Sequence, residues 1–148
     1  MTTDPISVDE VDPVEAYRLL ESHRNAALVD VRSRAEWAFV GMPDLSTIGK
    51  PVLPVEWIRF PDMAPNPTFV DELLQDLGAA QPERVFFICR SGQRSMAAAH
   101  AVSAETAEKG RPVYCTNVME GFEGGLDAEG HRGTLNGWKA RGLPWRQN

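Results

Sequence analysis

The chain has 148 residues, of which 43% are hydrophobic and 24% charged, and its formal net charge is −6 at pH 7. This length and composition fit one globular domain over residues 1–148, and they exclude a chain that is disordered throughout. Because nucleic acids are bound by clustered lysines and arginines, the acidic balance disfavours nucleic acid and an anionic membrane as partners.

Two features indicate the compartment. Residues 1–12 are acidic and lack the basic and apolar regions of a secretory signal, and no apolar run reaches the roughly 18 residues that a membrane span needs. The two cysteines, Cys89 and Cys115, are too few for a disulfide framework and have no metal-binding spacing. We therefore expect a soluble, cytoplasmic protein without a metal site.

Apolar runs rich in Val, Ile and Phe alternate with amphipathic stretches, which predicts strands alternating with helices. The first helix should follow Asp12 and Pro13, a favoured pair at a helix start. The glycine-rich stretch 121–142 should be mostly loop, with one short helix within residues 133–142. Further helices are expected at residues 33–40, 69–78 and 95–110, and strands at residues 26–32, 52–55, 84–88 and 112–116.

This alternation indicates an α/β fold with a mostly parallel central sheet of about five strands and helices on both faces. Pro54 suggests that its strand lies at an edge of the sheet or at a bulge. Since ligands bind at the carboxyl ends of parallel strands, the loops after Val31, Ile88 and Thr116 should meet at one site.

Cys89 directly follows a predicted strand, and a helix is expected to begin near Ser95. The free N–H groups and positive dipole of a helix start favour a thiolate, and Arg90 and Arg94 add positive charge. Gly92 lets the loop curl so that its amides face an anion. An inert cysteine buried at a strand end would need none of these neighbours, so we predict that Cys89 is a nucleophile.

Four segments together resemble the rhodanese-like family: LVDVRSRAEW (28–37), CRSGQRS (89–95), NVMEGFEGG (117–125) and GWKARGLPW (137–145). The resemblance implies the family's three-layer fold, a persulfide on Cys89 and substrate binding by the loop that follows it. That loop consists of Arg90, Ser91, Gly92, Gln93, Arg94 and Ser95. The resemblance also matches Asp30 and Arg32 to the family's Asp-Val-Arg, where we expect structural support rather than chemistry.

The implied reaction is a double displacement that needs no metal or organic cofactor. Cys89 would take a sulfane sulfur from thiosulfate or a persulfide and pass it to a thiol, to cyanide or to a protein acceptor. The loop amides would stabilise the terminal sulfur, while Arg94, together with Arg90, would orient an anionic donor.

Two other functions stay open. Cysteine-dependent phosphatases, and arsenate reductases of similar chemistry, place one residue more between Cys and Arg than the four that separate Cys89 from Arg94. The shorter loop should suit a terminal sulfur better than a phosphate. The chain could also be a binding or relay module that passes sulfur only to a partner protein.

Two expectations concern residues near this motif. Arg32 and Glu36 lie four positions apart and are candidates for an ion pair. Cys115 lies within an apolar strand and should be protonated and inert, so we do not expect it to be a redox partner of Cys89.

Two longer segments are candidates to shape the pocket. The first is the excursion 45–65, where Trp57 and Phe60 should pack or form a wall. The second is the glycine-rich segment 120–136, which contains His131 and is either a solvated loop or a partial lid that selects the acceptor.

Overall fold

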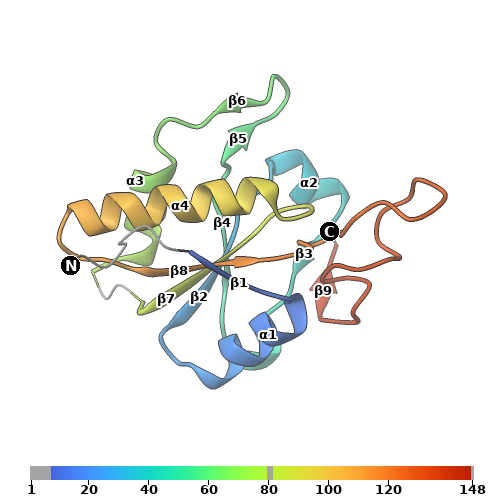
Figure 1. Cartoon of the computed structure of the whole chain (residues 1–148), viewed down its shortest axis with the longest axis horizontal. Helices are drawn as coiled ribbons and strands as arrows, with labels where there is room; N and C mark the ends of the chain where they lie inside the picture. Colours follow the sequence, from blue (N-terminus) through green and yellow to red (C-terminus); the bar gives the residue numbers. More distant parts are fainter. Residues whose placement is uncertain (1–7, 80–81, 148) are drawn as a thin grey trace.

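The computed structural model describes residues 8–79 and 82–147. Its central sheet consists of β1 (Asp9–Val11), β2 (Ala26–Asp30), β4 (Val52–Pro54), β7 (Arg84–Ile88) and β8 (Tyr114–Val118). The strand order is β1-β8-β7-β2-β4, and every neighbouring pair is parallel (Figure 1). The predicted α/β fold is confirmed, and so is the edge position that Pro54 suggested for β4.

Helices lie on both faces of this sheet. They are α1 (Pro13–Ser22), α2 (Arg34–Phe39), α3 (Phe69–Leu77) and α4 (Gln93–Glu108), with a short 3-10 turn at Ser46–Ile48. In Figure 1, α3 and α4 lie on one side of the sheet and α1 on the other. The side chains of β7 alternate between two hydrophobic cores, one on each face of the sheet. Val85 and Phe87 pack with α3 and α4, whereas Phe86 and Ile88 pack with α1. Burial on both faces explains why β7 is apolar at successive positions.

The edge strand β1 is not predicted by the sequence pattern, because it is short and two of its three residues are acidic. Polar contacts hold it against β8. Glu10 is the register partner of Asn117, and the Asp9 carboxylate accepts a hydrogen bond of 2.6 Å from the Thr116 hydroxyl.

The short helix predicted within residues 133–142 is wrong, because residues 121–144 contain turns and bends instead. Gly137 and Gly142 have φ of 99° and 77°, left-handed values that interrupt a right-handed helix. After this stretch, β9 (Trp145–Arg146) pairs antiparallel with β3 (Met42–Pro43).

Other boundaries shift by two residues. The strand expected at 112–116 begins at Tyr114, and the helix expected from residue 95 begins at Gln93. The proline-rich excursion forms a small antiparallel hairpin of β5 (Ile58–Arg59) and β6 (Ala64–Pro65), which projects beyond the central sheet (Figure 1).

Candidate active site

The loop that begins at Cys89 lies at the carboxyl end of β7, and Gly92, with φ of 112°, turns the chain into α4. The segment after β8 packs directly on this loop, since the Phe122 N–H donates to the Cys89 carbonyl at 2.8 Å. At Gly121 a Cβ atom would lie 2.5 Å from the same carbonyl oxygen, so this approach requires glycine. The loops after β7 and β8 therefore meet, as predicted.

Hydrogen-bond donors surround the sulfur of Cys89. The Gly92 N–H lies 3.1 Å from Sγ, measured from the nitrogen, and the Ser95 hydroxyl oxygen lies 3.2 Å from it. The whole residue is 1% exposed. Because α4 begins here, the positive end of its dipole adds to these donors, so the site can stabilise a sulfur anion.

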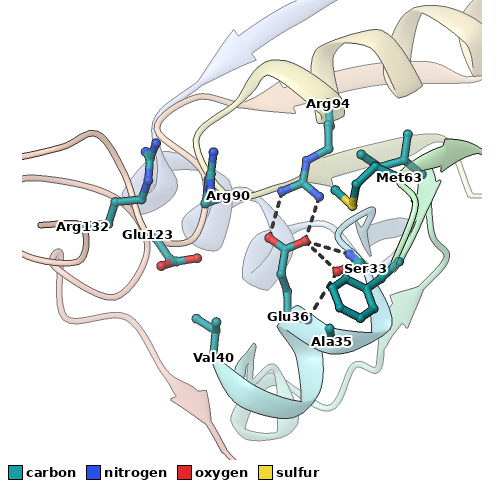
Figure 2. Close-up of a pocket in the computed structure, with 11 residues that line it drawn as sticks. Ser33, Ala35, Glu36, Val40, Met63, Arg90, Arg94, Glu123 and Arg132 are labelled. Atoms are coloured by element: carbon teal, nitrogen blue, oxygen red, sulfur yellow. Dashed lines mark hydrogen bonds and ion pairs between the residues drawn. The ribbon is translucent and has the colours of Figure 1, made fainter. Parts of the chain in front are cut away.

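Arg94, at the start of α4, is held by Glu36 of α2. Two N···O contacts of 2.8 Å join the guanidinium to the carboxylate. The same carboxylate accepts hydrogen bonds from the N–H and hydroxyl of Ser33 in a capping box at the start of α2 (Figure 2). Glu36 thus pairs with Arg94, and the ion pair expected between Glu36 and Arg32 is absent. The loop after β2 reaches the Cys89 loop through this contact.

This pairing changes the acid–base behaviour of both groups. Burial raises the pKa of Glu36, but the hydrogen bonds and charge of Arg94 and the Ser33 N–H outweigh it and bring the pKa to about 2. The hydrogen bond to Glu36 raises the pKa of Arg94. Arg94 is therefore held in a fixed position by Glu36, and its role in binding an anionic donor stays a prediction.

Asp30 and Arg32 are fully buried and paired with each other, with 2.7 Å between Arg32 Nη2 and Asp30 Oδ2. The same nitrogen donates to the Gly41 carbonyl at 2.6 Å, and the guanidinium lies 4.3 Å from the centre of the Phe122 ring. The Phe122 N–H also donates a hydrogen bond to the Cys89 carbonyl. The Asp30–Arg32 pair therefore contacts the segment that packs on the Cys89 loop.

A pocket of about 640 Å³ opens beside the Cys89 loop. One wall is apolar and comes from Val40 and the β5–β6 hairpin, including Ile58, Phe60 and Met63. The other side is charged and is formed by Arg90, Glu123, Arg132 and the Arg94–Glu36 pair (Figure 2). The pocket can therefore contact an apolar group and an anionic group at the same time.

Some of the other residues predicted to shape the site line this pocket, and others do not. Phe60 lines the pocket as expected, whereas Trp57 packs edge-on against Phe69 at 5.1 Å between ring centres. Arg132, rather than the exposed His131, is a pocket residue of the glycine-rich segment. In the binding loop, Ser91 is half-buried and Gln93 is exposed.

Cys115 is buried and free, and burial is the main cause that raises its thiol pKa to about 12. This agrees with the prediction that it is protonated. Within residues 8–79 and 82–147, no group of three or more His, Cys, Asp or Glu side chains is placed to hold a metal ion. Over the same residues, the structure contains no helix with both the length and the apolar character of a membrane span.

No family model matches the chain, but solved structures match its fold. The polysulfide-sulfur transferase of Wolinella succinogenes superposes with a TM-score of 0.57 at 18% identity over 95% of this chain and 80% of that one. The thiosulfate sulfurtransferase of Pseudomonas aeruginosa gives 0.56 at 16% identity over 95% of this chain and 20% of that one. At these identities the likeness is one of fold. It confirms the rhodanese-like fold that the sequence resemblance implied.

Relatives that match almost end to end show the family to which this chain belongs. The crystal structure of Rv0390 from M. tuberculosis is 47% identical, with a TM-score of 0.82 over 96% of this chain and 100% of that one. The uncharacterized protein RC0915 of Rickettsia conorii is 35% identical over 141 residues, covering 95% of this chain and 99% of the relative. A protein of Rickettsia prowazekii, RP600, is 34% identical over 139 residues, covering 94% and 98%, and is also uncharacterized.

Proposed function

We propose that this protein is a single-domain sulfurtransferase that carries a sulfane sulfur as a persulfide on Cys89. One observation carries the proposal: Sγ lies at the start of the 16-residue helix α4, 3.1 Å from the Gly92 nitrogen and 3.2 Å from the Ser95 hydroxyl. Donors placed in this way stabilise negative charge on sulfur before and after each transfer. The rhodanese-like fold, shared with two solved sulfurtransferases, supports the same chemistry.

The reaction has two displacements at sulfur. With thiosulfate as donor, the Cys89 thiolate attacks the outer sulfur, a new S–S bond forms, and sulfite leaves with the electron pair of the old S–S bond. An acceptor thiolate or cyanide then attacks the terminal sulfur of the persulfide. The Sγ–S bond breaks, its electron pair returns to Sγ, and the product is a new persulfide or thiocyanate.

The arginines of the site have different roles in this proposal. Arg94 is paired with Glu36, so it holds the start of α4 in place beside the Cys89 loop. Arg90 is exposed, lines the pocket, and makes no side-chain hydrogen bond or ion pair within the described residues. Arg90 is therefore the cation that orients an anionic donor.

The size of the pocket favours an organic persulfide over an inorganic anion as donor. A volume of about 640 Å³ is in the range of sites for drug-sized ligands and leaves most of the space unfilled by thiosulfate. The apolar wall would then contact the carbon part of the donor. Both cysteines are free, which fits the reducing, cytoplasmic compartment that we also propose.

Intact mass spectrometry tests the function directly. After incubation with thiosulfate or with an organic persulfide, the protein should gain the mass of one sulfur atom, and cyanide should remove it. Cys89→Ser should abolish the gain, whereas Cys115→Ala, the matched control, should keep it. Wild-type protein that stays unmodified with every donor but hydrolyses aryl phosphates would instead favour phosphatase chemistry.

A further inference from the structure

Asn117, a buried residue of β8, connects the active site to the edge strand β1. Its side-chain nitrogen lies 2.8 Å from the Glu10 carboxylate and 3.1 Å from the Gly92 carbonyl. A carboxylate and a carbonyl only accept hydrogen bonds, so both require the NH₂ side of the amide. These two acceptors therefore fix the orientation of the Asn117 side chain.

With the nitrogen fixed in this way, the Asn117 oxygen faces Ser95. The distance from Ser95 Oγ to Asn117 Oδ1 is 2.6 Å, shorter than the 3.2 Å from the same hydroxyl to the sulfur of Cys89. A serine hydroxyl has a single proton to donate. Ser95 can thus donate to Asn117 or to Cys89, but not to both at once.

We propose that Asn117, oriented by Glu10, competes with Cys89 for the Ser95 proton and thereby sets how readily Cys89 becomes a thiolate. When Ser95 donates to Asn117, its oxygen is free to accept the S–H of a neutral thiol. When the thiolate forms, the hydroxyl must turn toward Sγ and give up Asn117. Asn117 and Glu10 are positioning residues in this account, because they act through Ser95 and touch no substrate.

The same competition has a consequence for sulfur transfer, which rests on the proposed function. In the persulfide, Sγ is a neutral divalent sulfur and a weak acceptor, so Ser95 donates to Asn117. During release the acceptor bonds to the terminal sulfur, and the electron pair of the broken Sγ–S bond returns to Sγ. The Ser95 hydroxyl then turns to stabilise the charge that develops there, together with the Gly92 N–H.

The ultraviolet absorbance band of a thiolate tests the proposal without any substrate. At neutral pH this band reports Cys89, because Cys115, with a pKa of about 12, stays protonated. Asn117→Ala and Asn117→Val both remove the competing acceptor, so the thiolate band and the rate of alkylation by iodoacetamide should rise, the rate by about fivefold for one hydrogen bond gained. Ser95→Ala should lower both.

A double-mutant comparison separates this role from packing. If Asn117 acts through the Ser95 hydroxyl, its substitution should have no effect on the band or the rate in a Ser95→Ala background. Two results overturn the proposal: an Asn117 substitution that has the same effect with and without the Ser95 hydroxyl, or one that has no effect when Ser95 is intact. Circular dichroism and thermal unfolding identify variants that fail to fold.

Glu10→Ala provides a variant that leaves the buried residues intact, since Glu10 is exposed on β1. It removes one of the two acceptors that orient the amide, so a smaller rise of the same sign is expected. An unchanged thiolate band in this variant removes Glu10 from the proposal. Failure of sulfur transfer would be seen separately, as an unchanged mass after treatment with thiosulfate.

Discussion

Arg94 and Glu36 lie on two different helices and meet on the charged side of the pocket, joined by two N···O contacts of 2.8 Å (Figure 2). Only 19% of each side chain is exposed, so solvent screens the pair weakly. The pair ties the start of α4, which carries the Cys89 loop, to the start of α2. Its energetics can be separated from its role in sulfur transfer.

The first prediction concerns acid stability. The folded-state pKa of Glu36 is about 2, against an ordinary value of 4.5. A lowered carboxyl pKa adds stability above pH 4.5, and this stability is lost as the pH falls from 4.5 toward 2. At neutral pH, Glu36→Gln should therefore lower the free energy of unfolding by at most about 3 kcal/mol. In urea unfolding, the gap between wild type and variant should shrink across that window; a constant gap would contradict the assignment.

The second prediction separates positioning from chemistry at Arg94. Arg94→Ala leaves the Glu36 carboxylate partly buried without its cation, so both stability and the rate of persulfide formation should fall, the rate by about tenfold or more. Arg94→Lys keeps the charge but not the two-pronged geometry, so its stability and its rate should lie between those of wild type and Arg94→Ala. In the double variant Arg94→Ala/Glu36→Gln, stability should recover while the rate should not. Recovery of both would show that Arg94 is needed only for folding.

The sequence predicts the fold and the nucleophile because both depend on local patterns. The apolar run of β7, the cysteine after it and Gly92 before a helix are read within about a dozen residues, which is the range of strand and helix-start signals. The pairing of Glu36 with Arg94 escapes prediction, since 58 positions separate the two residues and Arg32 lies nearer in the chain. Only the fold, which places the starts of α2 and α4 close together, brings the two residues into contact.

The network around Asn117 escapes prediction for a related reason. Its partner Glu10 lies on β1, a strand too short and too acidic to be recognised from its pattern. Register between β1 and β8 places Glu10 beside Asn117, although 107 positions separate them in the chain. The strand expected from the sequence ends at residue 116, so Asn117 is not recognised as a buried side chain that needs partners for its amide.

The third prediction concerns the apolar wall of the pocket. Phe60 is 60% exposed and lines the pocket at the tip of the β5–β6 hairpin, so a bound organic donor would cover it. Phe60→Ala should raise the KM for an organic persulfide about fivefold, as expected when part of an aromatic contact is lost, and leave loading by thiosulfate unchanged. Phe39→Ala is the matched control, since Phe39 is 81% exposed but is not a pocket residue. Equal effects of the two substitutions on both donors would refute a specific role for the wall.

The last prediction concerns the segment 120–136 as a selective rim of the pocket. Its fold is set internally: the Asp127 carboxylate accepts from the N–H of His131 at 2.9 Å and from the Thr134 hydroxyl at 2.6 Å. Arg132 Nη1 donates to the Gly124 carbonyl at 2.7 Å, which places the Arg132 guanidinium at the pocket. We therefore expect this segment to act on the acceptor that approaches a loaded Cys89.

Arg132→Ala is the sharpest test of this rim, with His131→Ala as its neighbouring control. Loss of the Arg132 charge should slow sulfur release to a thiol that carries a carboxylate by about fivefold, the effect expected for one partly exposed charge contact. Release to an uncharged thiol, and loading by thiosulfate, should stay near wild type. Replacing residues 126–136 by a short Gly-Ser link should produce the same preference more strongly. Loading is measured by intact mass and release by acceptor kinetics, so the two half-reactions are resolved. If both variants keep wild-type rates with charged and uncharged thiols alike, the segment is a surface loop without a role in acceptor choice.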